Sequence, residues 1–324
     1  MRLPHALLDS QYFLFNSAGD LHKALGTSVD DEERATIDQL AQAGLPPVTS
    51  RNTLATLLGL NPGLIWSMER KPLRHYRTFL IPKGNGRHRR IDAPRVALKL
   101  IQKWLSIQLA KTYNPAEHVF GFISGRSHVD AARVHVNARW VFSVDIRDFF
   151  QTTPIRRVLD SLKEIGFNEE GALLIANLTC LNAHLAQGAP TSPTLSNICF
   201  AEMDSALLRI ARESRLRLSR YADDIVFSGT GEIPAQLQAQ LVALFTNTPW
   251  TLAEDKTSLA IAPKRLKVHG LLVSGNTVRL TKGYRNRLRA YEHLLTRGQI
   301  SAEDLATIRG HLAYAKFVER EALQ

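Results

Sequence analysis

The sequence predicts an α+β fold in which helical segments flank a central region that also contains strands. Three observations carry this prediction. Apolar residues recur at helical spacing over 30–68 and again from 282 onward, and strand-like runs gather between 76 and 228. Turn-forming Gly, Pro and Asn residues separate these segments. The 324 residues, 44% of them hydrophobic, are enough for a sizeable core in two or three domains.

The N-terminal part is predicted to be helical. Its pattern is broken at 44–47 (Gly-Leu-Pro-Pro) and at 61–63 (Asn-Pro-Gly), and Ser50 or Asn52 is placed to cap the second helix. From residue 76 the pattern changes to two strand-like runs joined by the turn-forming stretch 82–86, which predicts a β-hairpin with a basic tip.

The central region alternates helices and strands. Helical spacing over 95–112, 154–166 and 191–212 predicts three helices, and the apolar run 140–146 predicts a buried strand that contains Asp145. Two further predicted strands, 216–221 and 225–228, are joined through Ala222, Asp223 and Asp224.

The C-terminal part, from residue 282 onward, predicts two amphipathic helices. Arg285 and Arg289 form a basic row beside the apolar stripe of the first helix. Ser301 to Asp304 form a capping box at the start of the second.

The formal net charge of +11 is unevenly distributed. Residues 1–50 carry seven acidic and three basic side chains, whereas residues 70–90 carry eight basic and no acidic ones. Residues 264–324 carry twelve basic and five acidic side chains. Two basic regions around an apolar middle section predict a positively charged groove for phosphate groups, although basic faces exposed only to solvent would give the same count.

Membrane, disulfide and zinc proteins are not indicated. No run of 18 uncharged apolar residues is present, and Asp9 interrupts the N-terminal apolar stretch too early for a signal peptide. Cys180 and Cys199 lack the CxxC spacing of a metal site. We therefore expect a soluble, cytoplasmic protein with no membrane partner.

Three carboxylates occupy unusual places, because Asp145, Asp223 and Asp224 lie at the end of an apolar strand or in the turn between two strands. A buried charge is costly unless a cation is near. If the strands are adjacent, the three carboxylates can hold two Mg²⁺ ions, which prefer oxygen ligands. An Asp-Asp pair is also ordinary turn chemistry, so the setting between apolar strands decides in favour of a metal site.

With these residues the sequence resembles the reverse transcriptases. Tyr221-Ala222-Asp223-Asp224 resembles their YxDD motif, Val144 to Phe150 their first catalytic strand, and Gln187 to Asn197 the loop that faces template and nucleotide. The resemblance covers most of 76–317. It implies RNA-directed DNA polymerase activity and a right-hand polymerase fold.

The resemblance also implies a domain division. Residues 1–69 would be a helical N-terminal extension, 70–263 the fingers and palm, and 264–324 a basic helical thumb.

It assigns nucleotide-binding roles as well. Lys83 and Arg89 match the triphosphate-binding positions, with Arg87 and Arg90 as close alternatives to Arg89. Phe150 would lie under the sugar and exclude a 2′-hydroxyl, unless it is an ordinary core aromatic.

In the loop that faces the nucleotide, Gln187 would contact the nucleotide and Gly188 would let the backbone approach it. Lys256 would serve as a general acid near the pyrophosphate, unless it is a surface lysine.

Within this family the sequence looks like the bacterial retron enzymes over four stretches: 81–94, 98–105, 121–127 and 308–314. It departs from them in two elements. Their NAxxH reads Ala131 to His135 here, and their VTG reads Val268-His269-Gly270, at the place of the primer grip. His269, Gly270, Arg285 and Arg289 are therefore the expected primer- or RNA-binding residues.

The implied function is the copying of a structured non-coding RNA with dNTPs into single-stranded, msDNA-type DNA within an antiphage defence unit. Because the sequence ends soon after the expected thumb, we expect no ribonuclease H, endonuclease or integrase domain. Two alternatives stay open, a reverse transcriptase of another bacterial group and a catalytically silent RNA-binding scaffold. The acidic residues 1–50 would dock an effector or a second protomer, or form a solvated helical face.

Overall fold

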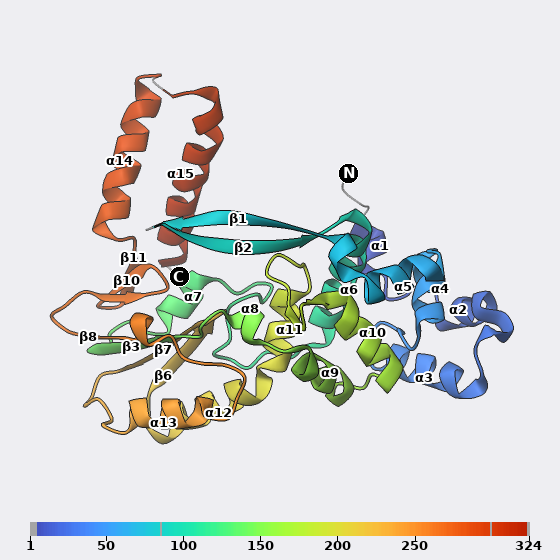
Figure 1. Cartoon of the computed structure of the whole chain (residues 1–324). Coiled ribbons are helices and arrows are strands. Elements are labelled where there is room, and N and C mark those ends of the chain that lie inside the picture. The colour runs from blue at the N-terminus through green and yellow to red at the C-terminus, as the bar shows by residue number, and fades with distance from the viewer. Residues whose placement is uncertain (1–4, 85, 299, 323–324) are drawn as a thin grey trace. The chain divides into compact units, whose positions relative to one another are not determined.

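The computed structural model describes residues 5–84, 86–298 and 300–322 (Figure 1). The chain forms two compact units, and each combines separate stretches of sequence. The first unit contains residues 1–114 and 148–201, and the second contains 115–147 and 202–324. Among the described residues, no helix is both long and apolar enough to cross a membrane.

The first unit begins with the predicted short helices. They are α1 (His5–Asp9), α2 (Ala18–Leu25), α3 (Asp31–Gln42), α4 (Arg51–Leu58) and α5 (Pro62–Arg70), with short 3₁₀ turns at Gly26–Ser28 and Pro72–His75. The side chain of Ser50, and not that of Asn52, caps α4 by accepting from the Thr53 amide. Asn61 caps α5, whose first residue is Pro62, so the Asn-Pro-Gly stretch begins this helix, whereas α4 already ends at Leu58 with Gly59 as its C-cap.

The predicted hairpin consists of β1 (Tyr76–Gly84) and β2 (Arg87–Pro94), which pair antiparallel with a register irregularity between Pro82 and Gly84. Asn85 of the predicted turn lies outside the described residues. The helix α6 (Val96–Thr112) follows, and its Ile101, Trp104 and Leu105 side chains are buried. Figure 1 shows the hairpin as a long two-stranded ribbon.

Helices and one small strand pair complete the first unit: α8 (Phe149–Thr152), α9 (Ile155–Glu164), α10 (Glu169–Thr179), β4 (Cys180–Leu181), β5 (His184–Leu185) and α11 (Ser192–Cys199). The helix predicted over 191–212 is thus two helices, because α11 ends at Cys199, Phe200 caps it, and α12 (Ala201–Glu213) begins with the next residue. Cys180 and Cys199 are both buried and free.

A four-stranded antiparallel sheet forms the centre of the second unit. Its strand order is β6 (Arg217–Tyr221), β7 (Asp224–Gly229), β3 (Trp140–Asp145) and β8 (Ser258–Ile261). Three of these strands are the predicted ones, and β8 was not predicted. The sheet is joined in this unit by α7 (His128–Arg133), α12 and α13 (Leu237–Phe245).

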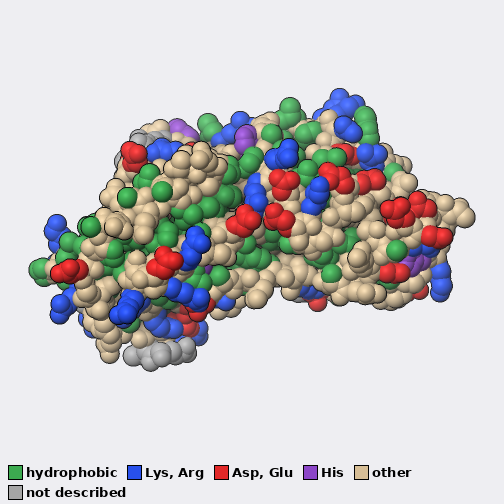
Figure 2. Space-filling model, turned by 90° about the horizontal axis from the view of Figure 1, so that it is seen from below, with side chains coloured by type: hydrophobic (Ala, Val, Ile, Leu, Met, Phe, Trp, Pro, Cys, Tyr) green, Lys and Arg blue, Asp and Glu red, His purple; other side chains and the backbone are tan. Residues whose placement is uncertain are grey.

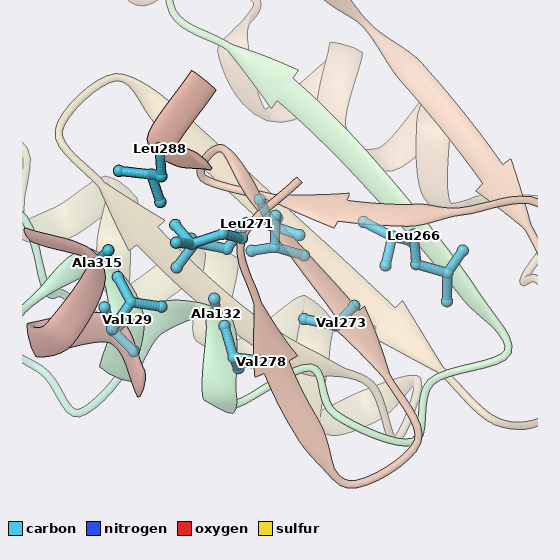
Figure 3. Close-up of a cluster of buried hydrophobic side chains, with 13 residues drawn as sticks. Val129, Ala132, Leu266, Leu271, Val273, Val278, Leu288 and Ala315 are labelled. Carbon is cyan, nitrogen blue, oxygen red and sulfur yellow. The ribbon is translucent and has the colours of Figure 1, made fainter. Parts of the chain in front are cut away.

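A smaller sheet and two long helices follow. The three strands β9 (Leu266–Val268), β10 (Leu271–Ser274) and β11 (Thr277–Arg279) precede the predicted helices α14 (Lys282–Thr296) and α15 (Ala302–Ala322). Figure 3 shows the hydrophobic cluster that joins them to the main sheet. Leu288 of α14 and Val318 of α15 pack there with Val141 of β3 and Val226 of β7. This cluster fixes the small sheet and α15 beside the strands that carry the three predicted carboxylates.

Candidate active site

The strand pairing brings the predicted carboxylates together. In the β3–β7 ladder, Asp145 lies directly opposite Asp224, and Asp223 is in the two-residue turn that precedes Asp224. Residues opposite each other on antiparallel strands have Cβ atoms about 4.5–5.5 Å apart. The turn is also fixed to the end of β3, because the Ile146 amide donates to the Asp223 carbonyl at 2.8 Å.

The turn has an unusual backbone that a buried ion pair supports. Ala222 has a φ of 59°, a left-handed conformation that costs a non-glycine residue about 1–2 kcal/mol. The Ala222 carbonyl accepts a hydrogen bond from the Arg220 guanidinium at 2.9 Å. That guanidinium is fully buried and donates twice to Asp204 of α12, each time at 2.6 Å.

Gly121 packs directly against the same turn. A Cβ atom at this position would lie 2.1 Å from the Ala222 nitrogen and 2.9 Å from the Tyr221 carbonyl carbon. The Phe120 amide donates to the Arg220 carbonyl at 2.9 Å, so the backbone before Gly121 is bonded to β6. Only glycine allows this close approach of two backbones.

A lysine and a histidine side chain contact the carboxylates. The Lys256 Nζ atom, from the 3₁₀ turn Glu254–Lys256, lies 2.5 Å from Asp145 Oδ1. His269 Nδ1 lies 2.9 Å from Asp224 Oδ2. Burial is the main cause that raises the pKa of Asp145; the Lys256 hydrogen bond opposes it, and the charges of Asp223 and Asp224 add to it.

The donor set suits a divalent metal ion. As the side chains stand, with Lys256 on Asp145 and His269 on Asp224, no three His, Cys, Asp or Glu residues among those described are arranged as a metal-binding group. Yet carboxylates on facing strands repel one another, and the charges of Asp223 and Asp224 add to the effect of burial in raising the pKa of Asp145. Hard divalent cations bind carboxylate oxygens and would relieve this repulsion. Asp145, Asp223 and Asp224 are therefore suitable ligands for a divalent metal ion.

A second set of predicted residues lies in the first unit. The Gln187 carbonyl accepts from the Asp92 amide of β2 at 2.8 Å. With its side-chain nitrogen facing the Arg90 carbonyl at 3.1 Å, Gln187 accepts from Arg89 Nε at 3.3 Å. Gly188 has a φ of 120°, and a Cβ there would lie 2.8 Å from the Ile91 side chain. The loop thus lies against β2 and gathers Gln187, Gly188 and Arg89.

The first unit contains three further candidates, Arg90, Lys83 and Phe150. Arg90 is paired with Asp92 at 3.1 Å, which distinguishes it from Arg89 beside Gln187. Lys83 is exposed where the hairpin register shifts. Phe150 is half-buried, and its ring stacks on that of Phe149 with centroids 6.0 Å apart.

Of the expected RNA-binding residues, three are accessible. Arg285 and Arg289 are exposed on α14, and Gly270 is exposed after β9. The His269 side chain differs, because it is only 3% exposed and faces the sheet. Any contact of this position with a primer would therefore be made by the backbone of His269 and Gly270.

Comparison with known proteins decides the family. A sequence profile described as "Reverse transcriptase (RNA-dependent DNA polymerase)" matches residues 81–273, more than half of the chain. The retron Mx65 reverse transcriptase of Myxococcus xanthus is 30% identical over 306 residues, which are 87% of this chain and 71% of that protein. The chain belongs to the retron reverse transcriptases. It is an RNA-directed DNA polymerase with the α+β right-hand fold of that family, as the motifs predicted.

Other relatives agree. The reverse transcriptase is 29% identical to the retron Mx162 enzyme of Myxococcus xanthus, over 87% of this chain and 66% of that protein. It is 24% identical to the retron Ec86 enzyme of Escherichia coli, over 76% of this chain and 78% of that protein. Enzymes with this domain generally depend on divalent metal ions. The match at 81–273 includes every candidate site residue except Arg285 and Arg289.

Several residues of the reverse transcriptase site escaped sequence reasoning. Asp204, Arg220 and Gly121 support the turn at Ala222 and Asp223, but their roles come from contacts between distant segments. One signal was present: Arg220 is a charged residue inside a strand whose neighbour Leu218 is buried, next to the YxDD motif. The pairing of Lys256 with Asp145 and of His269 with Asp224 had no sequence signal.

Proposed function

We propose that this reverse transcriptase copies a structured non-coding RNA into single-stranded, msDNA-type DNA in the cytoplasm, as part of an antiphage defence unit that can include an effector protein. The proposal rests on one observation above all. The pairing of β3 with β7 sets Asp145 opposite Asp224, with Asp223 in the adjoining turn. An RNA-binding scaffold without catalysis would gain nothing from three clustered carboxylates, which repel phosphate.

Asp145, Asp223 and Asp224 are the proposed ligands of two Mg²⁺ ions. When bound, such ions supply positive charge to the α-phosphate and the leaving oxygens and make the attacking hydroxyl more acidic. The chain's own residues do the rest. A hydroxyl of the RNA or of the growing DNA loses its proton to solvent as its oxygen bonds to the α-phosphorus, the bond to pyrophosphate breaks, and the Lys256 ammonium gives a proton to the departing pyrophosphate.

The nucleotide is proposed to bind to the group around Gln187. Lys83 and Arg89 would neutralise the triphosphate, since an ammonium and a planar guanidinium both suit phosphate oxygens. Gln187 would contact the nucleotide, and Gly188 leaves room for it because its backbone carries no side chain. The half-buried Phe150 ring would exclude a 2′-hydroxyl and so select dNTPs.

The nucleic acid is proposed to lie along the C-terminal part. Arg285 and Arg289 are exposed on one helix, where they can contact phosphates of the RNA or of the product duplex. The backbone at His269 and Gly270 would contact the primer end. In this assignment residues 1–69 are the N-terminal extension, 70–263 the fingers and palm, and 264–324 the thumb.

The experiment is to purify the enzyme with its native nucleic acid and sequence that nucleic acid, in the wild type and in Asp223→Asn plus Asp224→Asn. We expect the wild type to carry RNA covalently joined to DNA of defined sequence, and the variant to carry the RNA alone. Labelled dNTP incorporation on that RNA should fall to background in the variant, because the carboxylates that hold the metal ions are lost.

The matched control is Asp31→Asn plus Glu32→Gln, which removes an adjacent exposed acidic pair from α3. Its DNA synthesis should equal that of the wild type. RNA without DNA in the wild type would instead indicate the scaffold, and DNA of heterogeneous sequence would indicate a reverse transcriptase of another group. Synthesis that survives in the double Asn variant would refute the metal-ligand assignment.

A further inference from the structure

A continuous chain of hydrogen bonds runs beneath the catalytic turn and ends on Asp224. The Ser228 hydroxyl lies 2.7 Å from His135 Nδ1, and His135 Nε2 lies 2.7 Å from the Ser219 hydroxyl. The same Ser219 hydroxyl lies 3.1 Å from His269 Nε2, and His269 Nδ1 lies 2.9 Å from Asp224 Oδ2. We call these four side chains, Ser228, His135, Ser219 and His269, the Asp224 relay.

The proton positions in the relay follow from counting donors. An ionised carboxylate only accepts, so His269 Nδ1 donates to Asp224. With Nδ1 donating to Asp224, His269 Nε2 is placed to accept from the Ser219 hydroxyl, and Ser219 in turn accepts from His135 Nε2. Burial lowers the pKa of His135 to about 3, which keeps this ring neutral, so its Nδ1 accepts from Ser228. All four donors then point toward Asp224.

The relay is almost completely excluded from water. His135, Ser219 and Ser228 have no exposed surface, and the His269 side chain is 3% exposed. The Asp224 side chain, at the end of the relay, is 37% exposed. Each buried polar atom therefore needs its partner inside the protein, and a change in one member disturbs the others. Only the Asp224 carboxylate, on which the relay ends, faces solvent.

Several segments of the chain contribute to the relay, which makes it rigid. His135 follows α7, Ser219 belongs to β6, Ser228 and Asp224 belong to β7, and His269 follows β9. The Tyr221 ring of the catalytic motif packs against the His269 ring, with centroids 5.7 Å apart. The His269 ring is thus held from several sides, and it holds one oxygen of Asp224.

We propose that His269, supported by Ser219 and His135, is a positioning residue that fixes the Asp224 carboxylate for metal binding. This inference rests on the proposed role of Asp224 as a metal ligand. An aspartate at the start of a strand can rotate about two side-chain bonds. The hydrogen bond from His269 selects one orientation, as partners behind metal ligands do in other enzymes. Nucleotide transfer is sensitive to this, because a displacement of about 1 Å can cost a factor of about 100 in rate.

The test compares His269→Leu with His269→Asn on the full-length enzyme. Leucine removes both hydrogen bonds, whereas the asparagine amide nitrogen can replace Nδ1 and donate to Asp224. We expect His269→Leu to lower kcat about 10- to 100-fold, with the KM for dNTP little changed, and to weaken Mn²⁺ binding to the enzyme without nucleotide by a similar factor. Binding is measured from the paramagnetic signal of free Mn²⁺. His269→Asn should recover most of both losses.

A purely structural role gives a different pattern. It would lower the thermal unfolding temperature of His269→Leu and leave Mn²⁺ affinity and kcat of the folded enzyme at the wild-type values, which would overturn the inference. Ser219→Ala removes a single oxygen atom from the relay and should show the same two losses, at about tenfold, if His269→Leu does not fold. Asp224→Asn separates the two proposals: if it stays active, the metal-ligand assignment fails, and if it is inactive while His269→Leu is normal, only the relay fails.

Discussion

Arg220 carries a charge that has no access to water. Its guanidinium pairs with Asp204, whose side chain is itself only 2% exposed, and donates a further hydrogen bond to the Ala222 carbonyl. A buried ion pair adds little net stability over an apolar pair, but a single unpartnered charge in the same place is very costly. The pair therefore fixes the turn at Ala222 and Asp223 to α12. Loss of either partner would leave the other buried without a partner.

Asp204→Asn should consequently destabilise the enzyme strongly. It leaves the Arg220 charge buried without its counter-ion, so we expect a loss of about 3–5 kcal/mol in unfolding free energy. The control is Glu117→Gln, which breaks the exposed pair of Glu117 and Arg212 at 3.0 Å and should cost about 1 kcal/mol or less. Urea unfolding at pH 7 measures both. Equal losses in the two variants would contradict the importance of burial.

The same pair gives a pH dependence. Burial alone would raise the pKa of Asp204, but Arg220 and His118 bring it below its ordinary value. A carboxylate with a lowered pKa in the folded state stabilises that state above its unfolded pKa, about 3.9, and stops doing so as the pH falls through the folded pKa. The stability difference between the wild type and Asp204→Asn should therefore be full at pH 7 and shrink below about pH 4. A constant difference down to pH 3 would exclude this linkage.

Residue-level prediction from sequence succeeded where a residue type stood out in a local pattern. Charges at the ends of apolar strands are unusual, and this pattern pointed to Asp145, Asp223 and Asp224, which the structure brings together at one end of the β3–β7 pair. Their metal-binding role stays a prediction. His269 was expected to contact RNA, and its inward side chain could not be foreseen, since its partners Ser219 and Asp224 are 50 and 45 residues away in sequence. Tertiary contacts decide such roles, and periodicity carries no information about them.

At the scale of elements, the turn at Ala222 and Asp223 is supported by a second segment, the stretch that leads to Gly121. The stretch before Gly121 forms a parallel bridge between Val119 and Arg220, and Arg126 donates to the carbonyls of Ala116 and Val119 at 2.7 and 2.6 Å. These bonds fix the segment beside β6, so the closeness of Gly121 to Ala222 is not easily relieved by movement.

Gly121→Ala should therefore impair catalysis. The new Cβ would lie 2.1 Å from the Ala222 nitrogen, and because that atom is backbone and the Gly121 segment is itself hydrogen-bonded to β6, the turn with Asp223 must move. A displacement of about 1 Å at a catalytic group costs on the order of 100-fold in rate, so we expect a loss of that size in kcat. Gly231→Ala is the control, since its Cβ would meet nothing within 4 Å. Single-nucleotide incorporation measures both, and similar rates for the two variants would refute the role of Gly121.

Most long elements were predictable, although α10 and α13 were not predicted, and the shortest strands of the second unit were missed. The hairpin, β3, β6, β7, α6, α14 and α15 all have five or more residues with clear periodicity, and they were expected within a few residues of their bounds. The strands β8 to β11 have only three or four residues each, too few to show alternation. They form because partner strands and the hydrophobic cluster of Figure 3 are already in place.

At the scale of the whole molecule, sequence order and compact units do not coincide. The chain passes between its two units at 114–115, 147–148 and 201–202, so both units contain residues from distant parts of the sequence. Hydrophobic periodicity and turn residues are local signals, so they do not predict where the chain passes from one unit to the other. The uneven distribution of charge, by contrast, could be predicted from the sequence, because charged side chains are mostly exposed whichever unit they belong to. Figure 2 shows acidic side chains over the α2–α3 end of the first unit, where Asp30, Asp31 and Glu32 are exposed.

The positive net charge should act mainly through exposed arginines of the C-terminal helices. Arg285 and Arg289 are one turn apart on α14 and belong to a region with twelve basic and five acidic residues. If both contact phosphates, Arg285→Gln plus Arg289→Gln should release about 1.5 fewer counterions, so the slope of log affinity against log salt concentration becomes less steep by about 1.5. Affinity at low salt should fall, while the unfolding temperature stays the same.

Binding of the cognate RNA across a salt series measures that slope. The control, Lys23→Gln plus Arg156→Gln, removes two exposed cations outside the basic regions 70–90 and 264–324 and should leave the slope unchanged. The comparison separates local contact from net charge, because both variants lower the net charge equally. If both slopes fall alike, the RNA responds to the overall field of the protein and α14 is no binding surface; if only the α14 variant changes, the basic row contacts the RNA directly.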